Sequence, residues 1–113
     1  MIVSYSNGTD FLQANQALLQ ENPYLSTFFT LDAPLLKQAD TINYALRCEQ
    51  GDNWLLALKV EPYNLLLLGD EACVPELLRF LFDGGCELKN YLCASELGYV
   101  MQRELEPYGR RYE

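Results

Sequence analysis

The stretch EPYNLLLLGDE, residues 61–71, decides how the rest of the chain is interpreted. A proline-containing run ends one apolar segment, four consecutive leucines follow, and a glycine with two acids closes the stretch. A short, wholly apolar run between turn residues is typical of a buried β-strand. The pattern therefore predicts a central strand over residues 64–68, with the other elements packed around it.

The composition is that of one globular domain, which we assign to residues 1–113 with 107–113 as a tail. Half of the 113 residues are apolar and 21% are charged, which is far from a disordered profile. Sixteen acidic against eight basic residues leave a net charge of -8. Such a field repels nucleic acid and anionic lipid, and no apolar run reaches the roughly 18 residues of a membrane span. We therefore expect neither nucleic-acid nor membrane partners.

The cysteines indicate a reducing compartment. There is no Cys-x-x-Cys pair, and the chain has no histidine to complete a zinc site. Each cysteine lies in or beside an apolar pattern, which favours a small buried side chain over a disulfide or a reactive thiol. Residues 1–6 lack the features of a signal peptide. We expect a cytosolic, cytoplasmic protein without a metal site. The four cysteines are Cys48, Cys73, Cys86 and Cys93.

The first half of the chain is predicted to be helical. Apolar residues recur at helical spacing over 10–20, and Asn22-Pro23 is a good start signal for a second helix. The aromatic cluster of that second helix, which includes Tyr24 and Phe29, is expected to fill a core. Residues 2–5 favour either a short edge strand or an extended lead-in.

From Thr41 the apolar period changes to two, which predicts strands. They are expected over 41–49, 54–60 and 64–68, with a hairpin turn at 50–53. Gly69-Asp70-Glu71 is then expected to cap an amphipathic helix, in which Pro75 introduces a kink or a restart. Residues 86–95 are expected to be a connection, and Ser95 to cap the last helix.

This order of elements predicts an α+β fold. N-terminal helices come first, followed by an antiparallel three-stranded sheet, or a four-stranded one if residues 2–5 join it. C-terminal helices are expected to pack on one face of the sheet.

The residue types do not form a recognisable catalytic constellation. The lack of histidine removes the commonest way to activate a serine or cysteine nucleophile. Paired carboxylates, Asp70 with Glu71 or Glu49 with Glu61, are better explained as solvated surface. The acids after Gly69 repel phosphate. Trp54 and Tyr63 suit stacking on a ligand at a sheet edge, although aromatic residues in strands are more often structural.

A family resemblance carries the functional interpretation. ALKVEPYNLLL at 57–67, preceded by a helix pair and followed by GDE and an amphipathic helix, resembles the N-terminal domain of two-part GNAT-type acetyltransferases. In those proteins a PPYNLLLS-like strand junction precedes an acidic helix, and Glu61 stands here where the family often has its first proline. Cys93-Ala94 stands where a glycine is common. The likeness extends from Asp10 to Arg111.

The resemblance implies a catalytic domain in cis that is absent from this chain. Arg110-Arg111-Tyr112 resembles the linker that leads into the acetyl-coenzyme A domain. The signature of that domain, Gln/Arg-x-x-Gly-x-Gly/Ala, whose amides cradle the coenzyme pyrophosphate, has no match here. We therefore expect a domain from a longer protein, or the product of a truncated gene. The chain itself is expected to bind no cofactor, and acetyl-CoA is implied for the parent protein.

Under this hypothesis the chain is a non-catalytic accessory domain that shapes the acceptor side or positions the catalytic domain. Tyr63 and Asn64 are the candidates for facing the acceptor or the partner domain, with Trp54 as a third. The alternative is a free-standing acidic interaction module that forms a homodimer through an exposed apolar face or sheet edge. That alternative is suggested by Phe80, which lies off the main helical stripe.

Overall fold

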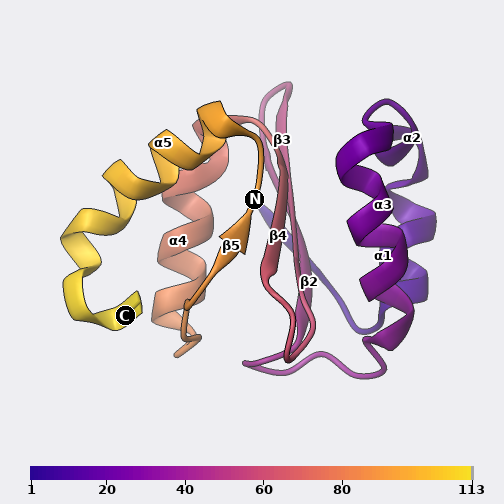
Figure 1. The fold of residues 1–113 in the computed structure, drawn as a ribbon, viewed down its shortest axis with the longest axis horizontal. Helices are drawn as coiled ribbons and strands as arrows, with labels where there is room; N and C mark the ends of the chain where they lie inside the picture. The colour runs from indigo at the N-terminus through magenta and orange to yellow at the C-terminus, as the bar shows by residue number, and fades with distance from the viewer. Residues whose placement is uncertain (113) are drawn as a thin grey trace.

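The chain folds into three layers, with a sheet between two groups of helices. A computed structural model describes residues 1–112, and the side chains of residues 1–109. The N-terminal helices cover one face of the sheet and helices α4 and α5 cover the other (Figure 1). The predicted α+β class and the C-terminal helices on one face are confirmed. Of the predicted tail, 107–113, the backbone as far as Tyr112 belongs to the 3-10 helix η3, Glu106–Tyr112, and the side chains from 110 on lie outside those that the structure describes.

The sheet contains five strands, in the order β1-β2-β3-β4-β5. The first four are antiparallel neighbours, so residues 2–5 do form an edge strand, and β5 joins β4 in parallel. The sheet has one strand more than the largest number expected. That strand, β5, was missed because its two residues are too few to show an alternating pattern. The strands are β1 Ile2–Tyr5, β2 Tyr44–Gln50, β3 Asn53–Lys59, β4 Leu65–Gly69 and β5 Tyr91–Leu92.

The leucine run forms a buried strand, as predicted. Leu65 and Leu67 belong to the core under α4 and α5, whereas Leu66 and Leu68 belong to the core under the N-terminal helices. All four are at least 95% buried. Because β4 is covered on both faces, it requires apolar residues at every position rather than at alternate ones.

The helix expected over 10–20 is divided at Asn15. Its buried side chain donates from Nδ2 to the Phe11 carbonyl oxygen at 2.9 Å and accepts from Arg47 Nη1 at Oδ1 at 3.0 Å. A side-chain amide that bonds a backbone carbonyl competes with the helix ladder. The N-terminal elements are α1 Gly8–Ala14, α2 Gln16–Gln20, α3 Pro23–Asp32 and the 3-10 turn η1 Ala33–Leu35.

Helix α3 starts at Pro23 as predicted, but its aromatic cluster is only partly core. Phe29 is buried and stacks on Phe11, with ring centroids 6.0 Å apart. Tyr24 was expected in the core, yet the residue is 79% exposed. It lies on the outer side of α3, where its ring meets the Phe28 ring edge-on, with the ring centroids 6.2 Å apart.

In the C-terminal part, a short 3-10 turn is followed by a new helix, α4, and Pro75 lies in the first turn of that helix. The helix therefore restarts near Pro75, which is one of the two predicted outcomes. Asp70 occupies the N-cap position of η2 without a capping bond from its side chain, and the cap predicted at Ser95 is wrong. Asp70 uses its side chain to accept the Trp54 N–H at 3.1 Å, and Ser95 is the first residue of its helix, after Ala94. Across residues 1–112, no helix is long and apolar enough to cross a membrane. The elements are η2 Glu71–Cys73, α4 Val74–Asp83, α5 Ser95–Leu105 and η3 Glu106–Tyr112.

Candidate functional site

Three connections meet at one end of the molecule and form a pocket. They are residues 36–43 before β2, 60–64 between β3 and β4, and 84–90 between α4 and β5, all at the lower end in Figure 1. The pocket has a volume of 460 Å³, which is within the usual range for small-molecule sites. Its polar lining includes Lys59, Glu61, Asn64, Glu87, Lys89 and Asn90.

The β3–β4 turn is fixed from both sides by hydrogen bonds that its backbone N–H groups donate. Within the turn, the Tyr63 N–H donates to the Val60 carbonyl oxygen at 2.8 Å. The Glu61 N–H donates to Asn43 Oδ1 at 2.7 Å, and the Leu65 N–H donates to the Asn90 carbonyl oxygen at 3.1 Å. The turn is therefore bonded to both neighbouring connections, and β4 anchors it in the sheet.

Asp40 orders the wall of the pocket that carries Ile42. Its Oδ1 accepts the backbone N–H groups of Ile42 at 2.7 Å and Asn43 at 2.6 Å. Hydrogen bonds to a carboxylate favour its charged form, so the Asn43 and Ile42 amides lower the pKa of Asp40. The same residues place the Asn43 side chain against the turn.

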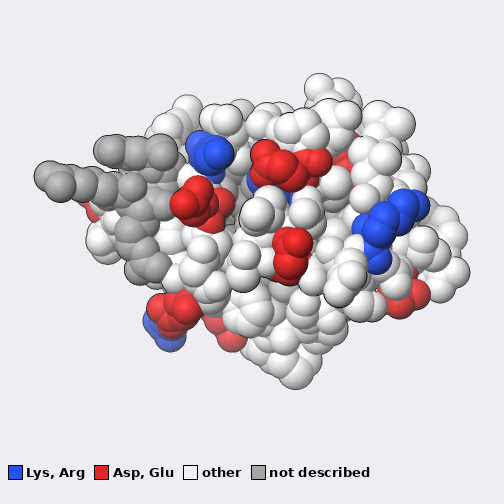
Figure 2. Space-filling model, turned by 90° about the horizontal axis from the view of Figure 1, so that it is seen from below, with Lys and Arg blue, Asp and Glu red and all other residues white. Residues whose placement is uncertain are grey.

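The pocket contains charges of both signs. Lys59 Nζ donates to Glu61 Oε2 at 3.0 Å, and the Lys59 side chain is only 12% exposed. The hydrogen bond from Lys59 and the positive charge of Lys59 lower the pKa of Glu61, and the Lys89 charge adds to the effect. Figure 2 shows this end of the molecule from below, with acidic and basic side chains interspersed.

The structure brings two of the three sequence candidates to the pocket. Tyr63, whose side chain is 50% exposed, and the exposed Asn64 both line it. Trp54 lies at the other end of β3, half-buried against the N-terminal helical layer. The sequence candidates are therefore not a single group in space.

The sequence interpretation missed the charged residues of the pocket. It considered Glu49 with Glu61 as a carboxylate pair and explained both as solvated surface, whereas the structure pairs Glu61 with Lys59, and Glu49 with Arg47 at 2.6 Å. Lys59 ends β3 and Glu61 stands two residues later in the turn, so opposite charges close together in the sequence were an available signal. Glu87 and Lys89 lie in a connection without regular periodicity, so no pattern pointed to them.

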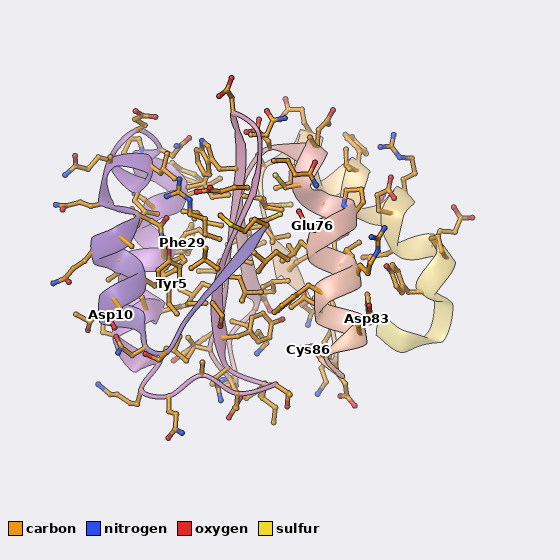
Figure 3. The ribbon with its side chains drawn as sticks, turned by 180° about the vertical axis from the view of Figure 1, so that it is seen from behind. Tyr5, Asp10, Phe29, Glu76, Asp83 and Cys86 are labelled. Atoms are coloured by element: carbon orange, nitrogen blue, oxygen red, sulfur yellow. The ribbon has the colours of Figure 1, made fainter. Side chains whose placement is uncertain are left out.

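A second polar cluster ties β2 to α4 outside the pocket. Glu76, labelled on α4 in Figure 3, accepts from the Met1 amino group at 2.9 Å, Cys48 Sγ at 3.2 Å and Gln50 Nε2 at 3.1 Å. These donors, the Met1 amino group first, lower the pKa of Glu76 to about 2. These contacts join α4 to parts of the chain that are distant in sequence. Glu76 therefore has a structural role.

The thiols are unsuited to nucleophilic chemistry. All four cysteines are free, and burial raises the pKa of each of them. Since the thiolate is the reactive form, a raised pKa keeps them inert. Within residues 1–112, no group of three or more His, Cys, Asp or Glu side chains is placed to hold a metal ion.

Comparisons of the chain with protein-family models, with curated proteins and with solved structures found no match.

Proposed function

We propose that this chain is the non-catalytic N-terminal accessory domain of a GNAT-like N-acetyltransferase. Its role would be to shape the acceptor side of a site completed by a catalytic domain in the same polypeptide. The observation that carries the proposal is the Pro62–Leu68 junction. Its leucines form a strand buried on both faces, and the turn before them presents Tyr63 and Asn64 beside a pocket. Recognition residues are commonly held on a turn by a rigid scaffold in this way.

The chemistry of the described residues supports a positioning role. Lys59 and Glu61 are paired with one another, and the cysteine thiols have raised pKa values. The transfer chemistry is therefore assigned to the partner domain, which would bind acetyl-CoA. The free thiols are compatible with a reducing compartment, and we place the protein in the cytosol.

Kinetics on the protein that contains the catalytic domain test this function. Tyr63→Ala and Asn64→Ala should raise the KM for the amine acceptor and leave the KM for acetyl-CoA unchanged, because the turn faces the acceptor side. Tyr99→Ala is the matched control, since Tyr99 is exposed on α5, outside the pocket. Equal effects of the Tyr63 and Tyr99 substitutions, or a reading frame that ends at Glu113, would remove the proposal.

A cofactor-binding measurement separates the accessory role from that of an autonomous enzyme. Calorimetric titration of the 113-residue chain with acetyl-CoA should give no binding heat. Saturable binding would reassign the cofactor site to this chain and end the accessory interpretation.

A specific observation also favours the second candidate, an interaction module that self-associates. Helix α3 and the following turn expose Tyr24, Leu31 and Leu35, and Leu31 is 65% exposed. The spacings of seven and four residues place these side chains along one side of a helix, as in helix–helix interfaces. Phe80 on α4 is also exposed, but it stands apart from this stripe in the sequence.

The oligomeric state tests the second candidate. Light scattering coupled to size exclusion should give a dimer for the wild-type chain and a monomer for Leu31→Ser if α3 is the interface. Phe80→Ser serves as the control on the other helical layer. A strictly monomeric wild-type chain at high concentration would argue against self-association.

A further inference from the structure

The pocket at the β3–β4 turn has an unusual division of its charges. Lys59 and Glu61 form an ion pair at 3.0 Å, and the Lys89 charge also acts on Glu61. Glu87 and Lys89, on the connection after α4, line the same pocket, and neither forms an ion pair with another residue that the structure describes. One carboxylate and one ammonium group therefore remain available to a ligand.

The mixture of positive and negative side chains in the pocket favours one class of ligand. A dianion would gain from Lys89 but would also meet the carboxylates of Glu61 and Glu87, and a dication would meet Lys59 and Lys89. Like charges at close range disfavour both classes. A molecule with one carboxylate and one ammonium group satisfies both unpaired side chains and leaves the pocket neutral.

The remaining lining suits the rest of such a molecule. Asn64 and Asn90 contribute side-chain amides, for which no bond to another described residue competes. Ile42 and Tyr63 contribute apolar surface, and each is at least half exposed. The turn that carries Asn64 is held by hydrogen bonds to both neighbouring connections, so little ordering is required on binding.

We propose that this pocket binds a small zwitterion of the amino-acid class with an apolar side chain. Lys89 binds its carboxylate, Glu87 binds its ammonium group, and Ile42 and Tyr63 contact its apolar part. The inference rests on the proposed function for the ligand's role as acceptor. Binding itself is a property of this chain alone.

A titration with L-leucine, followed by amide chemical shifts of the isotope-labelled chain, tests the proposal. L-Leucine should give saturable shifts confined to residues 41–43, 59–64 and 85–90. N-Acetyl-L-leucine lacks the ammonium group and L-leucinamide lacks the carboxylate, so each should bind at least tenfold more weakly. No saturable shift with L-leucine, or equal binding of all three compounds, would overturn the ligand class.

Charge-neutralising variants assign the two contacts. Glu87→Gln should weaken L-leucine binding at least tenfold and remove the preference for L-leucine over N-acetyl-L-leucine, which lacks the ammonium group. Lys89→Gln should weaken it equally and remove the preference over L-leucinamide. Glu71→Gln and Arg79→Gln make the same changes in net charge at exposed positions outside the pocket. They should bind like the wild-type chain, and weakening by these controls would contradict a local contact.

The two proposals fail separately. If L-leucine does not bind while Tyr63→Ala still raises the acceptor KM of the longer protein, the ligand class is wrong and the accessory role stands. If L-leucine binds and the reading frame ends at Glu113, the accessory role is wrong and the binding site stands. The amide spectrum of each variant also reports whether it is folded.

Discussion

Replacing Leu67 by alanine tests whether β4 is the buried centre of the molecule. Leu67 is fully buried, lies opposite Ala57 of β3 and belongs to the core under α4 and α5. The change removes three side-chain carbons, worth about 2.4 kcal/mol at about 0.8 kcal/mol per buried methylene. The cavity left behind adds to this, so we expect a loss in the free energy of unfolding of about 2–5 kcal/mol.

Urea denaturation is a suitable assay because the chain has a single tryptophan. Trp54 is half-buried at the start of β3, so its fluorescence should change when the sheet unfolds. For a small domain the free energy falls by about 1–3 kcal/mol per molar urea. A loss of about 3 kcal/mol therefore lowers the midpoint by about 1–3 M, and a marginally stable domain would unfold without urea.

A matched leucine provides the control. Leu31→Ala removes the same atoms from the exposed side of α3, and in the monomer it should change stability by less than about 0.5 kcal/mol. Leu66→Ala should resemble Leu67→Ala, because Leu66 belongs to the core on the opposite face. If Leu67→Ala and Leu31→Ala had the same midpoint, β4 would not be the buried centre of the sheet.

Three further substitutions test other parts of the fold. Gly69→Ala should destabilise the chain more than Gly51→Ala in urea unfolding. Both glycines have positive φ, but a Cβ at Gly69 would lie 2.3 Å from the Trp54 carbonyl oxygen, whereas Gly51 faces open space; equal effects would contradict the close contact. Asn15→Ala should cost about 1–3 kcal/mol because it leaves Arg47 Nη1 without its amide partner, while Asn53→Ala at the exposed hairpin should have little effect; a neutral Asn15 variant would show that the buried bond does not contribute. Glu76→Gln should flatten the pH dependence of stability in acid. The pKa of Glu76 is lowered from 4.5 to about 2 on folding, so its contribution is present above about pH 4.5 and is lost as the pH falls through about 2; unfolding midpoints between pH 5 and 2 that run parallel in wild type and variant would exclude this contribution.

Local patterns predicted most of the elements because their signals lie within a few residues. Asn22-Pro23 marks the start of α3, and the two-residue turn at Gly51-Asp52 joins β2 to β3 as expected. The division at Asn15 was not expected from periodicity, and one of the two bonds that hold its side chain comes from Arg47, which is distant in sequence. β5 was missed for a related reason: its two residues pair with β4 only in the folded chain.

The pocket is formed by residues from three separate connections, so contacts between residues that are distant in sequence determine it even more than they determine β5. Its unpaired charges come from 84–90, a connection without periodicity that lies beside Lys59 in the fold, where the Asn90 carbonyl oxygen bonds the first residue of β4. The leucine run thus has two separable effects. It supplies stability through burial on both faces, and it fixes where Tyr63 and Asn64 stand. Exposed charges contribute little to stability, so Lys89→Gln should lose ligand without lowering the urea midpoint, whereas Leu67→Ala should lower the midpoint. A Lys89 variant that lost both together would show that the pocket is part of the core's support.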